Sequence, residues 1–270
     1  MNYGGEQVRS ELLEPWLHEH GARTADWFAS LGERPAAPHS ALTDDDLWDL
    51  YAFSRVNDAL RMDFQPFRPQ SGAPDRWRDW FGLTLDDYCH FVRRCGLEVL
   101  PPAPEFIPVK HEIVTVDQSP DDAAPISLSA ELWPMVAAGA LLISRAGAHV
   151  AAGRDNLVKE VAENSALYWA YLRRNRRCTD LSVGWGGNSQ WRTAFRRDYY
   201  SYGRWSLNVD ANAEVLADMD LSDWPNRQRL ELLMHRCLVT AGRPDDDDGW
   251  PYDDSLDGTD DDLKAILAAG

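Results

Sequence analysis

The stretch HEIVTVD, residues 111–117, decides the fold class, because the chain changes there from helical to strand-forming sequence. Residues such as Ile113 and Thr115 alternate with their neighbours, and the β-branched content is typical of a short strand. The preceding run LPPAPEFIP, residues 100–108, has four prolines in nine residues, which excludes a helix and favours an extended connector. We place the internal boundary of the chain at this connector.

The first hundred residues have helical periodicity and two capping signals. In LTDDDLWDLYAFSRVNDAL, Thr43 stands three residues before Asp46, and in LTLDDYCHFVRRCG, Thr84 stands three residues before Asp87. The spacing resembles a capping box with Asp in place of Glu or Gln, and acidic residues in a first turn suit the helix dipole. The sequence therefore predicts a helix after each threonine.

Three longer segments follow the boundary. The run GALLISRAGAHVAAG, residues 139–153, predicts one or two strands broken near Ala146 and Gly147, and a helix is the competing interpretation. Apolar residues recur at steps of three and four throughout residues 154–177, which predicts the best helix of the chain. Residues 223–242 predict another helix, with proline in the first turn and glycine at the end.

These elements predict an α+β protein: a helical N-terminal part, a small central β-sheet with flanking helices, and an acidic C-terminal tail. We divide the chain into four parts. They are a mainly helical part (1–100), an α+β core (101–242), an acidic disordered linker (243–258) and a short C-terminal helix (259–270). The linker is expected to be disordered because it has too few apolar residues to pack by itself.

Composition excludes several classes of protein. The 270 residues are 44% hydrophobic, enough for a sizeable core, and their formal charge of −17 argues against nucleic acid as a partner. We find no apolar run long enough to cross a membrane and no secretory signal, which favours a cytoplasmic protein. The four cysteines form no CxxC pair, so we expect reduced thiols and no metal site.

The charge is unevenly distributed along the chain. Residues 154–205 carry a net charge of +5, whereas residues 243–270 carry −8. The basic segment contains the run GWGGNSQWRTAFRRDYY, residues 184–200, which lacks the lysine of a phosphate loop and the third glycine of a dinucleotide loop. We interpret this run as a hairpin, or alternatively a helix, that separates an aromatic face from an arginine face.

A guanidinium group beside an aromatic ring suits a phosphate or carboxylate held against a flat ring, so this run is a candidate ligand site. Its candidate ligand-binding residues are Trp185, Asn188, Gln190, Arg192, Arg196 and Arg197. The alternative is that the aromatic rings belong to the core and the arginines pair with acids such as Asp180 and Asp198.

A second basic cluster is a candidate surface for an anionic partner. It comprises Arg173, Arg174, Arg176 and Arg177. The alternative is that these cations complement the dipole at the C-terminus of the predicted helix. The acidic tail of this same chain is one candidate partner, since its charge is opposite.

His111 and Tyr199 are the candidate catalytic residues, with His111 as a general base beside the arginine motif. His18 and His20 do not predict a metal site, because positions i and i+2 of a helix point apart. We find no Ser-His-Asp order, no GxSxG motif and no signature of a cofactor.

The run in residues 184–200, together with HEIV, ELWP and ALYWAYLRRNR upstream, resembles a family of uncharacterised bacterial proteins, actinobacterial in type, that carry a GWGxNSQWRTxFRRDY motif. The resemblance covers residues 105–210. The resemblance implies that this region is the centre of the domain. It implies no activity and no catalytic residue.

The sequence favours a soluble binding protein that recognises an anionic or aromatic ligand, or a partner protein, through an Arg/aromatic surface, as an immunity-type module does. The alternative is an enzyme that acts on a small acidic or nucleotide-like molecule in a pocket with His111, Arg192, Arg196 and Tyr199. RNA binding is a third hypothesis for the function. The sequence leaves the oligomeric state open.

Overall fold

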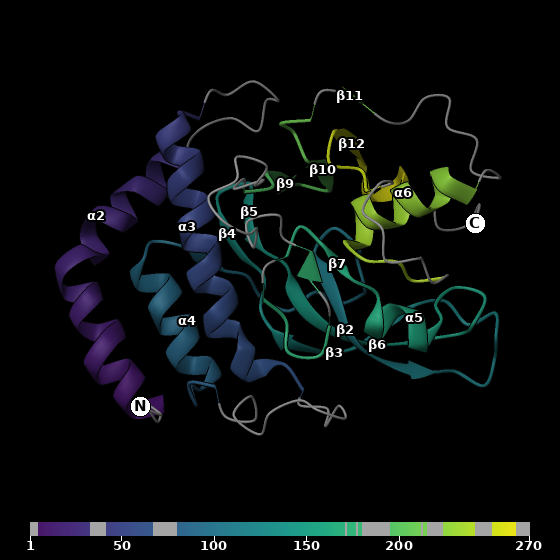
Figure 1. The fold of residues 1–270 in the computed structure, drawn as a ribbon, viewed down its shortest axis with the longest axis horizontal. Helices are drawn as coiled ribbons and strands as arrows, with labels where there is room; N and C mark the ends of the chain where they lie inside the picture. Colours follow the sequence, from purple (N-terminus) through teal and green to yellow (C-terminus); the bar gives the residue numbers. More distant parts are fainter. Residues whose placement is uncertain are drawn as a thin grey trace, which may run out of the picture.

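The structure is a computed structural model of the chain. It describes residues 5–32, 42–66, 80–170, 172–176, 178–179, 195–211, 213–214, 224–240 and 250–262. Helices and three sheets are combined, which confirms the α+β class and the helical N-terminal part (Figure 1).

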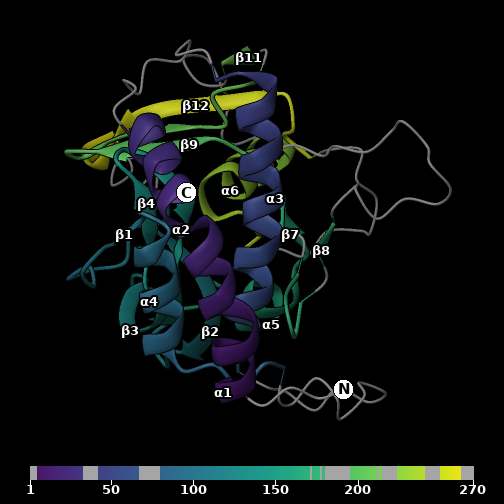
Figure 2. The same cartoon turned by 90° about the vertical axis from the view of Figure 1, so that its left-hand side faces the viewer.

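The N-terminal part is a layer of helices. Its elements are α1 (Gly5–Gln7), the π-helix η1 (Val8–Leu13), α2 (Glu14–Gly32), α3 (Asp44–Leu60), the 3-10 helix η2 (Arg61–Phe64) and α4 (Leu85–Arg94). Figure 2 looks onto this layer, with α2, α3 and α4 in front of the strands. The layer buries its inner face against one side of the largest sheet.

Both predicted capping boxes are confirmed. The Thr43 hydroxyl accepts from the Asp46 backbone N–H at 3.2 Å, and Asp46 accepts in return from the Thr43 N–H at 3.0 Å. Thr84 and Asp87 make the same reciprocal pair, with both bonds at 3.1 Å. Each pair satisfies two N–H groups that the first helical turn leaves without intrahelical partners, which is why α3 and α4 begin where they do.

Within the described residues the strands form three sheets. They are β1 (Glu98–Val99), β2 (His111–Gln118), β3 (Ser127–Trp133), β4 (Val136–Ala138), β5 (Leu141–Ser144), β6 (Ala146–Ala152), β7 (Leu167–Tyr168), β8 (Cys178–Thr179), β9 (Asp198–Ser201), β10 (Arg204–Leu207), β11 (Ala213–Glu214) and β12 (Asp254–Thr259). The largest sheet has the order β1-β4-β5-β9-β10-β12-β11, the second has the order β2-β6-β3, and β7 pairs with β8.

The strand predictions around the connector are confirmed. The predicted strand at residues 111–117 is β2, and residues 139–153 form two strands, β5 and β6. The break between β5 and β6 falls at Arg145, one residue before the predicted position. Because β5 belongs to the largest sheet and β6 to the three-stranded sheet, Arg145 joins the two sheets.

The long helix predicted over residues 154–177 is wrong. Helix α5 spans Lys159–Asn164 alone, and the chain then enters β7. Leu167 and Tyr168 are consecutive and both fully buried, so the chain has no single buried stripe of the kind that a surface helix needs. Arg176 donates to the carbonyls of Ala162 and Ser165, which satisfies the end of α5 with a side chain.

The C-terminal predictions need two corrections. Helix α6 spans Trp224–His235 and stops well before Gly242, because Arg236 has a left-handed backbone with φ of 62°. Residues 254–258, predicted to be disordered, belong to strand β12, which pairs with β10 and β11. The strand is stabilised by burial of Leu256 against α6 and β10. Residues 243–249 and 263–270 lie outside the described residues.

Three hydrophobic clusters hold these layers together. The first lies between the N-terminal helices and strands β4, β5 and β9, the second joins β2, β6 and α5, and the third joins α6 to β10 and β12. Cys89, Cys95 and Cys237 are buried in the interior as free thiols. In the described part of the chain, no helix combines the length and apolar character needed to cross a membrane.

Candidate functional site

The most unusual feature of the interior is a polar cavity of about 40 Å³ between the helical layer and the two larger sheets. Segments from five parts of the chain line it: α3 with η2, the end of β5, the residue after β7, the start of β9 and the residue after α6. Among the described residues, its charged lining consists of Arg55, Arg61, Arg145, Arg196, Arg236, Asp58 and Asp198. We call it the arginine cavity.

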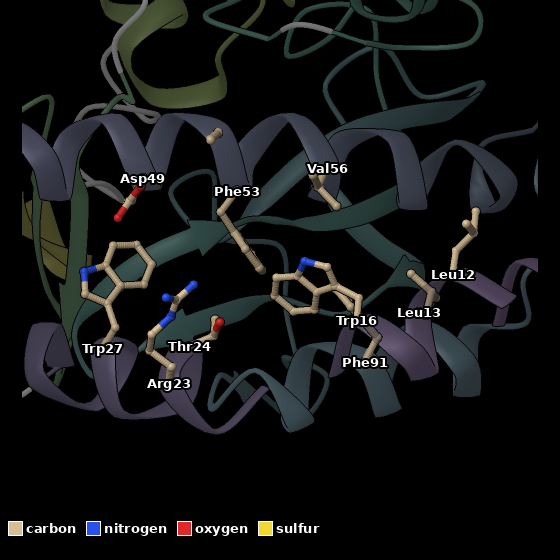
Figure 3. Close-up of a pocket in the computed structure, with 11 residues that line it drawn as sticks. Leu12, Leu13, Trp16, Arg23, Thr24, Trp27, Asp49, Phe53, Val56 and Phe91 are labelled. Atoms are coloured by element: carbon tan, nitrogen blue, oxygen red, sulfur yellow. The ribbon is translucent and has the colours of Figure 1, made fainter. Parts of the chain in front are cut away.

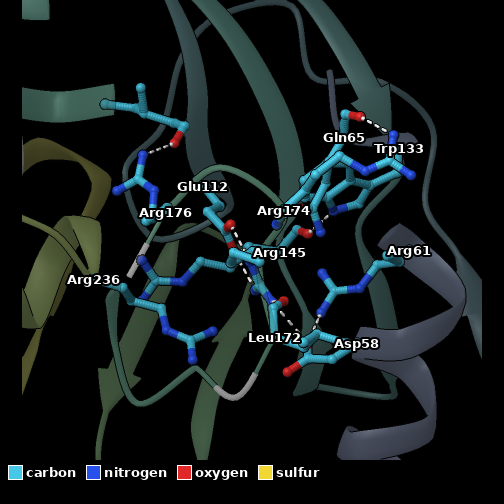
Figure 4. A network of polar contacts seen from close by, with 12 residues as sticks. Asp58, Arg61, Gln65, Glu112, Trp133, Arg145, Leu172, Arg174, Arg176 and Arg236 are labelled. Carbon is cyan, nitrogen blue, oxygen red and sulfur yellow. Dashed lines mark hydrogen bonds and ion pairs between the residues drawn. The ribbon is translucent and has the colours of Figure 1, made fainter. Parts of the chain in front are cut away.

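The helical side of the arginine cavity is built on an ion pair. Arg61 lies 2.5 Å from Asp58 (Figure 4). Arg173 reaches the same carboxylate oxygen at 3.0 Å. Burial raises the pKa of Asp58, but Arg173 and Arg61 outweigh it and hold that pKa below its usual value. Asp58 is therefore ionised and already shared between two guanidinium groups.

Behind this pair, Arg173 binds Glu112 of β2 through two parallel hydrogen bonds. The Arg173 Nε and Nη2 atoms donate to the two carboxylate oxygens at 2.6 and 2.7 Å. Both side chains are buried, and the fork geometry is the strongest that a guanidinium can make with a carboxylate. Burial raises the pKa of Glu112, yet the charge of Arg173 and its hydrogen bonds hold it far below the usual range.

The sheet side of the arginine cavity centres on Asp198. Its carboxylate accepts from Arg196 Nε at 2.8 Å and lies 3.2 Å from Arg145 Nη2, so one aspartate serves two arginines. Arg145 also donates to the carbonyls of Pro108 and Met234, and Arg196 donates to the Leu233 carbonyl at 2.7 Å. These neutral carbonyls orient the guanidinium groups but do not neutralise their charge.

Positive charge is therefore in excess around the arginine cavity. Five arginines and two aspartates are the charged members of its described lining. Within the described part of the chain, buried N–H groups of four of these arginines have no acceptor: Arg61 Nη1, Arg145 Nε, Arg196 Nη1 and Arg236 Nε. A buried donor without an acceptor costs roughly 1–3 kcal/mol, and more when the group is charged.

Arg236 is the clearest cation in excess. Within the described ranges it makes no ion pair, and its Nη2 donates only to the Trp169 carbonyl, at 3.3 Å. Burial, aided by the charge of Arg196, lowers its pKa to about 10, although Glu112 and Asp198 oppose the shift. Burial likewise lowers the pKa of Arg145 to about 9, although Asp198 opposes the shift. The surroundings thus disfavour the positive charge that these arginines carry.

The backbone beside the arginine cavity is strained at two positions. Trp169 and Arg236 have φ values of 70° and 62°, in the left-handed region that residues with side chains rarely adopt. They are adjacent in space, because the Tyr168 N–H donates to the Arg236 carbonyl at 2.7 Å. Such strain costs on the order of 1–3 kcal/mol per residue and is concentrated at functional sites in proteins.

The residues that line the arginine cavity differ in exposure. Most of its lining is buried, and the partly exposed members among the described residues are Ser54, Arg55, Trp169 and Arg236.

The structure turns most of the described arginines of the predicted clusters inward. The Arg174 guanidinium donates to the backbone carbonyl of Gln65, its backbone N–H donates to the Gln65 side chain, and the Arg176 guanidinium donates to backbone carbonyls. Together with the Arg173–Glu112 pair, these contacts correct the prediction of an exposed arginine surface at the end of a helix. The reason is that these guanidinium groups satisfy acids and carbonyls of the core. Arg177 lies outside the described residues.

The described arginines of the run at residues 184–200 also point into the interior, but to different partners. Arg196 lines the arginine cavity, but Arg197 pairs with Asp210 and donates to the Tyr199 hydroxyl at 3.3 Å. Tyr199 itself is buried against the helical layer. The remaining candidates lie outside the described residues: Trp185, Asn188, Gln190 and Arg192.

The acidic tail does not cover the arginine cluster where it is described. Asp254 pairs with Arg229 of α6, and Asp260 accepts from the Tyr200 hydroxyl at 2.7 Å. These contacts attach the tail to α6 and β9 instead.

His111 is a core residue that does not line the arginine cavity. Its Nε2 lies 3.2 Å from Glu131, its Nδ1 lies 2.9 Å from the backbone of Ile107, and its ring stacks on Phe106. Burial lowers the pKa of His111, although Glu131 opposes the shift. The fold thus does not bring His111 and Tyr199 to the cavity that holds Arg196. No group of three or more His, Cys, Asp or Glu in the described ranges is arranged to hold a metal ion.

Sequence reasoning missed five of the charged residues that line the arginine cavity: Arg55, Asp58, Arg61, Arg145 and Arg236. A usable signal was present at two of them. Arg145 is the lone charge in GALLISRAGAHV, and Arg236 interrupts the apolar run after α6. A single arginine inside an apolar segment must have a partner for its charge when it is buried.

Comparison with known proteins gives no assignment: no family model, no curated protein and no solved structure matches the chain.

Proposed function

We propose that the protein is a soluble, cytoplasmic binding protein that holds the oxyanion group of a small ligand, a phosphate or a carboxylate, in the arginine cavity. The observation that carries this proposal is the charge of the described lining, with five arginines against two aspartates.

The physical reason is the cost of burying unbalanced charge. A buried guanidinium needs a counter-charge and acceptors for its N–H groups, and Asp58 and Asp198 are each already shared by two arginines. An oxyanion would supply both, because its oxygens accept from the forked N–H groups of several arginines at once.

The size of the arginine cavity favours an anionic group over a whole metabolite. A volume of about 40 Å³ compares with roughly 10–15 Å³ for one water molecule, so it suits about three oxygen-sized atoms. The remainder of a larger ligand would lie toward Ser54 and Trp169. This reading keeps the anionic ligand expected from the sequence and moves its site from the surface to the interior.

The catalytic alternative has less support. A base and a nucleophile must lie within hydrogen-bond reach of the bound group, and neither His111 nor Tyr199 lines the arginine cavity. Partner-protein binding and RNA binding through an exposed arginine surface lose support because Arg173 and Arg196 are buried in internal ion pairs.

Anion binding is tested by thermal unfolding in inorganic phosphate, sulfate or acetate at constant ionic strength. We expect at least one anion to raise the melting temperature in a saturable way, since a ligand at 100 times its Kd adds about 2.7 kcal/mol. The Arg236→Met variant should lose this response. The Arg229→Met variant should keep it, because Arg229 is a partly exposed residue of α6 that pairs with Asp254.

A rise that never saturates, or one that Arg236→Met and Arg229→Met share equally, would show a general salt effect and reject the proposal. Isothermal titration calorimetry with the same anions provides the stoichiometry, for which we expect one site per chain.

A further inference from the structure

A second site lies on the opposite side of the helical layer, in an open groove of about 790 Å³ between α2 and α3. Trp16 and Trp27 line it from α2, Phe53 and Val56 from α3, and Phe91 from α4 at its floor (Figure 3). None of these residues belongs to the arginine cavity, so the groove is a separate feature.

The groove exposes large apolar side chains to solvent. Leu12, Trp16 and Val56 are exposed at 48%, 38% and 47%, and they are three of the six large hydrophobic residues that the described part of the chain exposes. Single exposed apolar residues are ordinary, but several gathered in one concave surface mark a binding site. Aromatic side chains are also the residues most enriched at the centres of protein interfaces.

The shape of the groove favours a helix as its occupant. Its lining runs along η1 and α2 from Leu12 to Trp27, which corresponds to about 22 Å at 1.5 Å per residue. A purely apolar small molecule would need a pocket that encloses it on all sides. This groove is open, because Leu12 and Val56 are exposed, so one side of any occupant stays in water. An amphipathic helix matches both properties, with an apolar stripe in the groove and a polar face outside.

The charge of the two walls defines the partner further. Apart from the buried Asp46 and Asp58, helices α2 and α3 carry six Asp or Glu residues and two Arg residues. The charged residues of the groove lining itself are Asp49 and Arg23, and both are exposed, so the acidic excess comes from the rest of the two helices. In the described ranges Asp49 makes no ion pair, so it is available to a cation of the partner. Opposite charges on partner surfaces accelerate association and fix orientation.

We propose that this groove binds a basic amphipathic helix of a partner protein. The apolar stripe of that helix packs between Trp16, Phe53 and Val56, and its Lys or Arg residues face Asp49 and the acidic walls. This site is independent of the anion that the arginine cavity binds.

The probe is a fluorescein-labelled peptide of about 18 residues of Leu and Lys, with Leu at helical positions i, i+3, i+4 and i+7. Fluorescence anisotropy should show saturable binding to the full chain. The variant Val56→Asp should weaken binding about tenfold, or about 1.4 kcal/mol. The matched control is Leu85→Asp, which changes a residue of α4 with 39% exposure that does not line the groove, and it should bind as the unmodified chain does.

A second variant tests the charge of the groove and leaves its apolar packing unchanged. Asp49→Lys changes an exposed residue, so it should leave the fold intact, which circular dichroism checks. It should weaken the Leu/Lys peptide and strengthen a Leu/Glu peptide with the same stripe.

Three results would overturn the proposal: no binding of the Leu/Lys peptide, equal binding of a scrambled peptide without the stripe, or equal binding of the Leu/Glu peptide. Displacement of the Leu/Lys peptide by decanoate would assign the groove to an aliphatic acid instead of a helix, and would overturn it as well.

Discussion

At the scale of single residues, buried arginines define this protein. Sequence patterns predicted Arg196 as a candidate ligand-binding residue on an exposed face, whereas it is buried, because alternation tells which residues share a face and not which face is covered. The same limit applies to Arg173, whose partners Asp58 and Glu112 lie 115 and 61 positions away. Only the folded chain brings such acids and bases together, so this part of the site was beyond sequence reasoning.

The Arg173–Glu112 pair gives a prediction at this scale. Glu112→Gln removes one charge of a buried, doubly hydrogen-bonded pair and leaves Arg173 in excess, so we expect a loss of about 3–5 kcal/mol in the free energy of unfolding. Urea denaturation measures it. The control is Glu160→Gln, which breaks an exposed 3.7 Å pair with Arg154 and should cost less than about 1 kcal/mol. Equal losses of unfolding free energy in the two variants would contradict the stabilising role of the buried Arg173–Glu112 pair.

At the scale of elements, local signals predicted where helices begin better than how far they continue. The caps at Thr43 and Thr84 were predicted correctly, since a capping box is a contact between residues three positions apart. The prediction of one helix over residues 154–177 was wrong. Its apolar residues are spaced as in a helix, but after α5 consecutive residues such as Leu167 and Tyr168 are both buried. Strand β12 was missed because its sequence, DSLDGT, is polar and is stabilised by pairing on both edges.

The capping boxes are testable as elements. Thr43→Ala and Thr84→Ala should each lower the free energy of unfolding by about 1 kcal/mol, because each leaves an N–H group of the first turn without its acceptor. Chemical denaturation measures the change. Thr24→Ala is the control, since the Thr24 hydroxyl only donates to the His20 carbonyl within α2. That change should be nearly neutral or stabilising, and a loss as large as that of the caps would argue against the capping role.

At the scale of the whole molecule, the fold class was predicted from one strand-forming stretch after a helical region. The joining of several sheets around a charged interior was not predicted, because it depends on pairings between distant strands such as β10 with β12. The buried titratable groups of this interior act together on stability.

These groups predict a loss of stability in acid. Burial lowers the pKa of His235 from 6.5 to about 3, so between these values the unfolded chain takes up a proton that the folded chain does not. Stability therefore falls as the pH drops below about 6.5. Below about pH 4, Asp58, Glu112 and Asp198 add to the loss, because their pKa values in the folded chain are lower than in the unfolded chain.

Thermal melts between pH 7 and pH 4 measure the slope. His235→Phe, which keeps a ring to stack on Phe106, should flatten it, and the exposed control His90→Phe should leave it unchanged. An unchanged slope in His235→Phe would refute the assignment.

The position of Arg145 has a mechanical consequence. It is the single residue between β5 and β6, and these strands belong to different sheets. Its backbone carbonyl accepts from Trp133 of β3, while its side chain reaches Asp198 of β9. A change in the angle between the two sheets must therefore alter the spacing of the guanidinium groups around it.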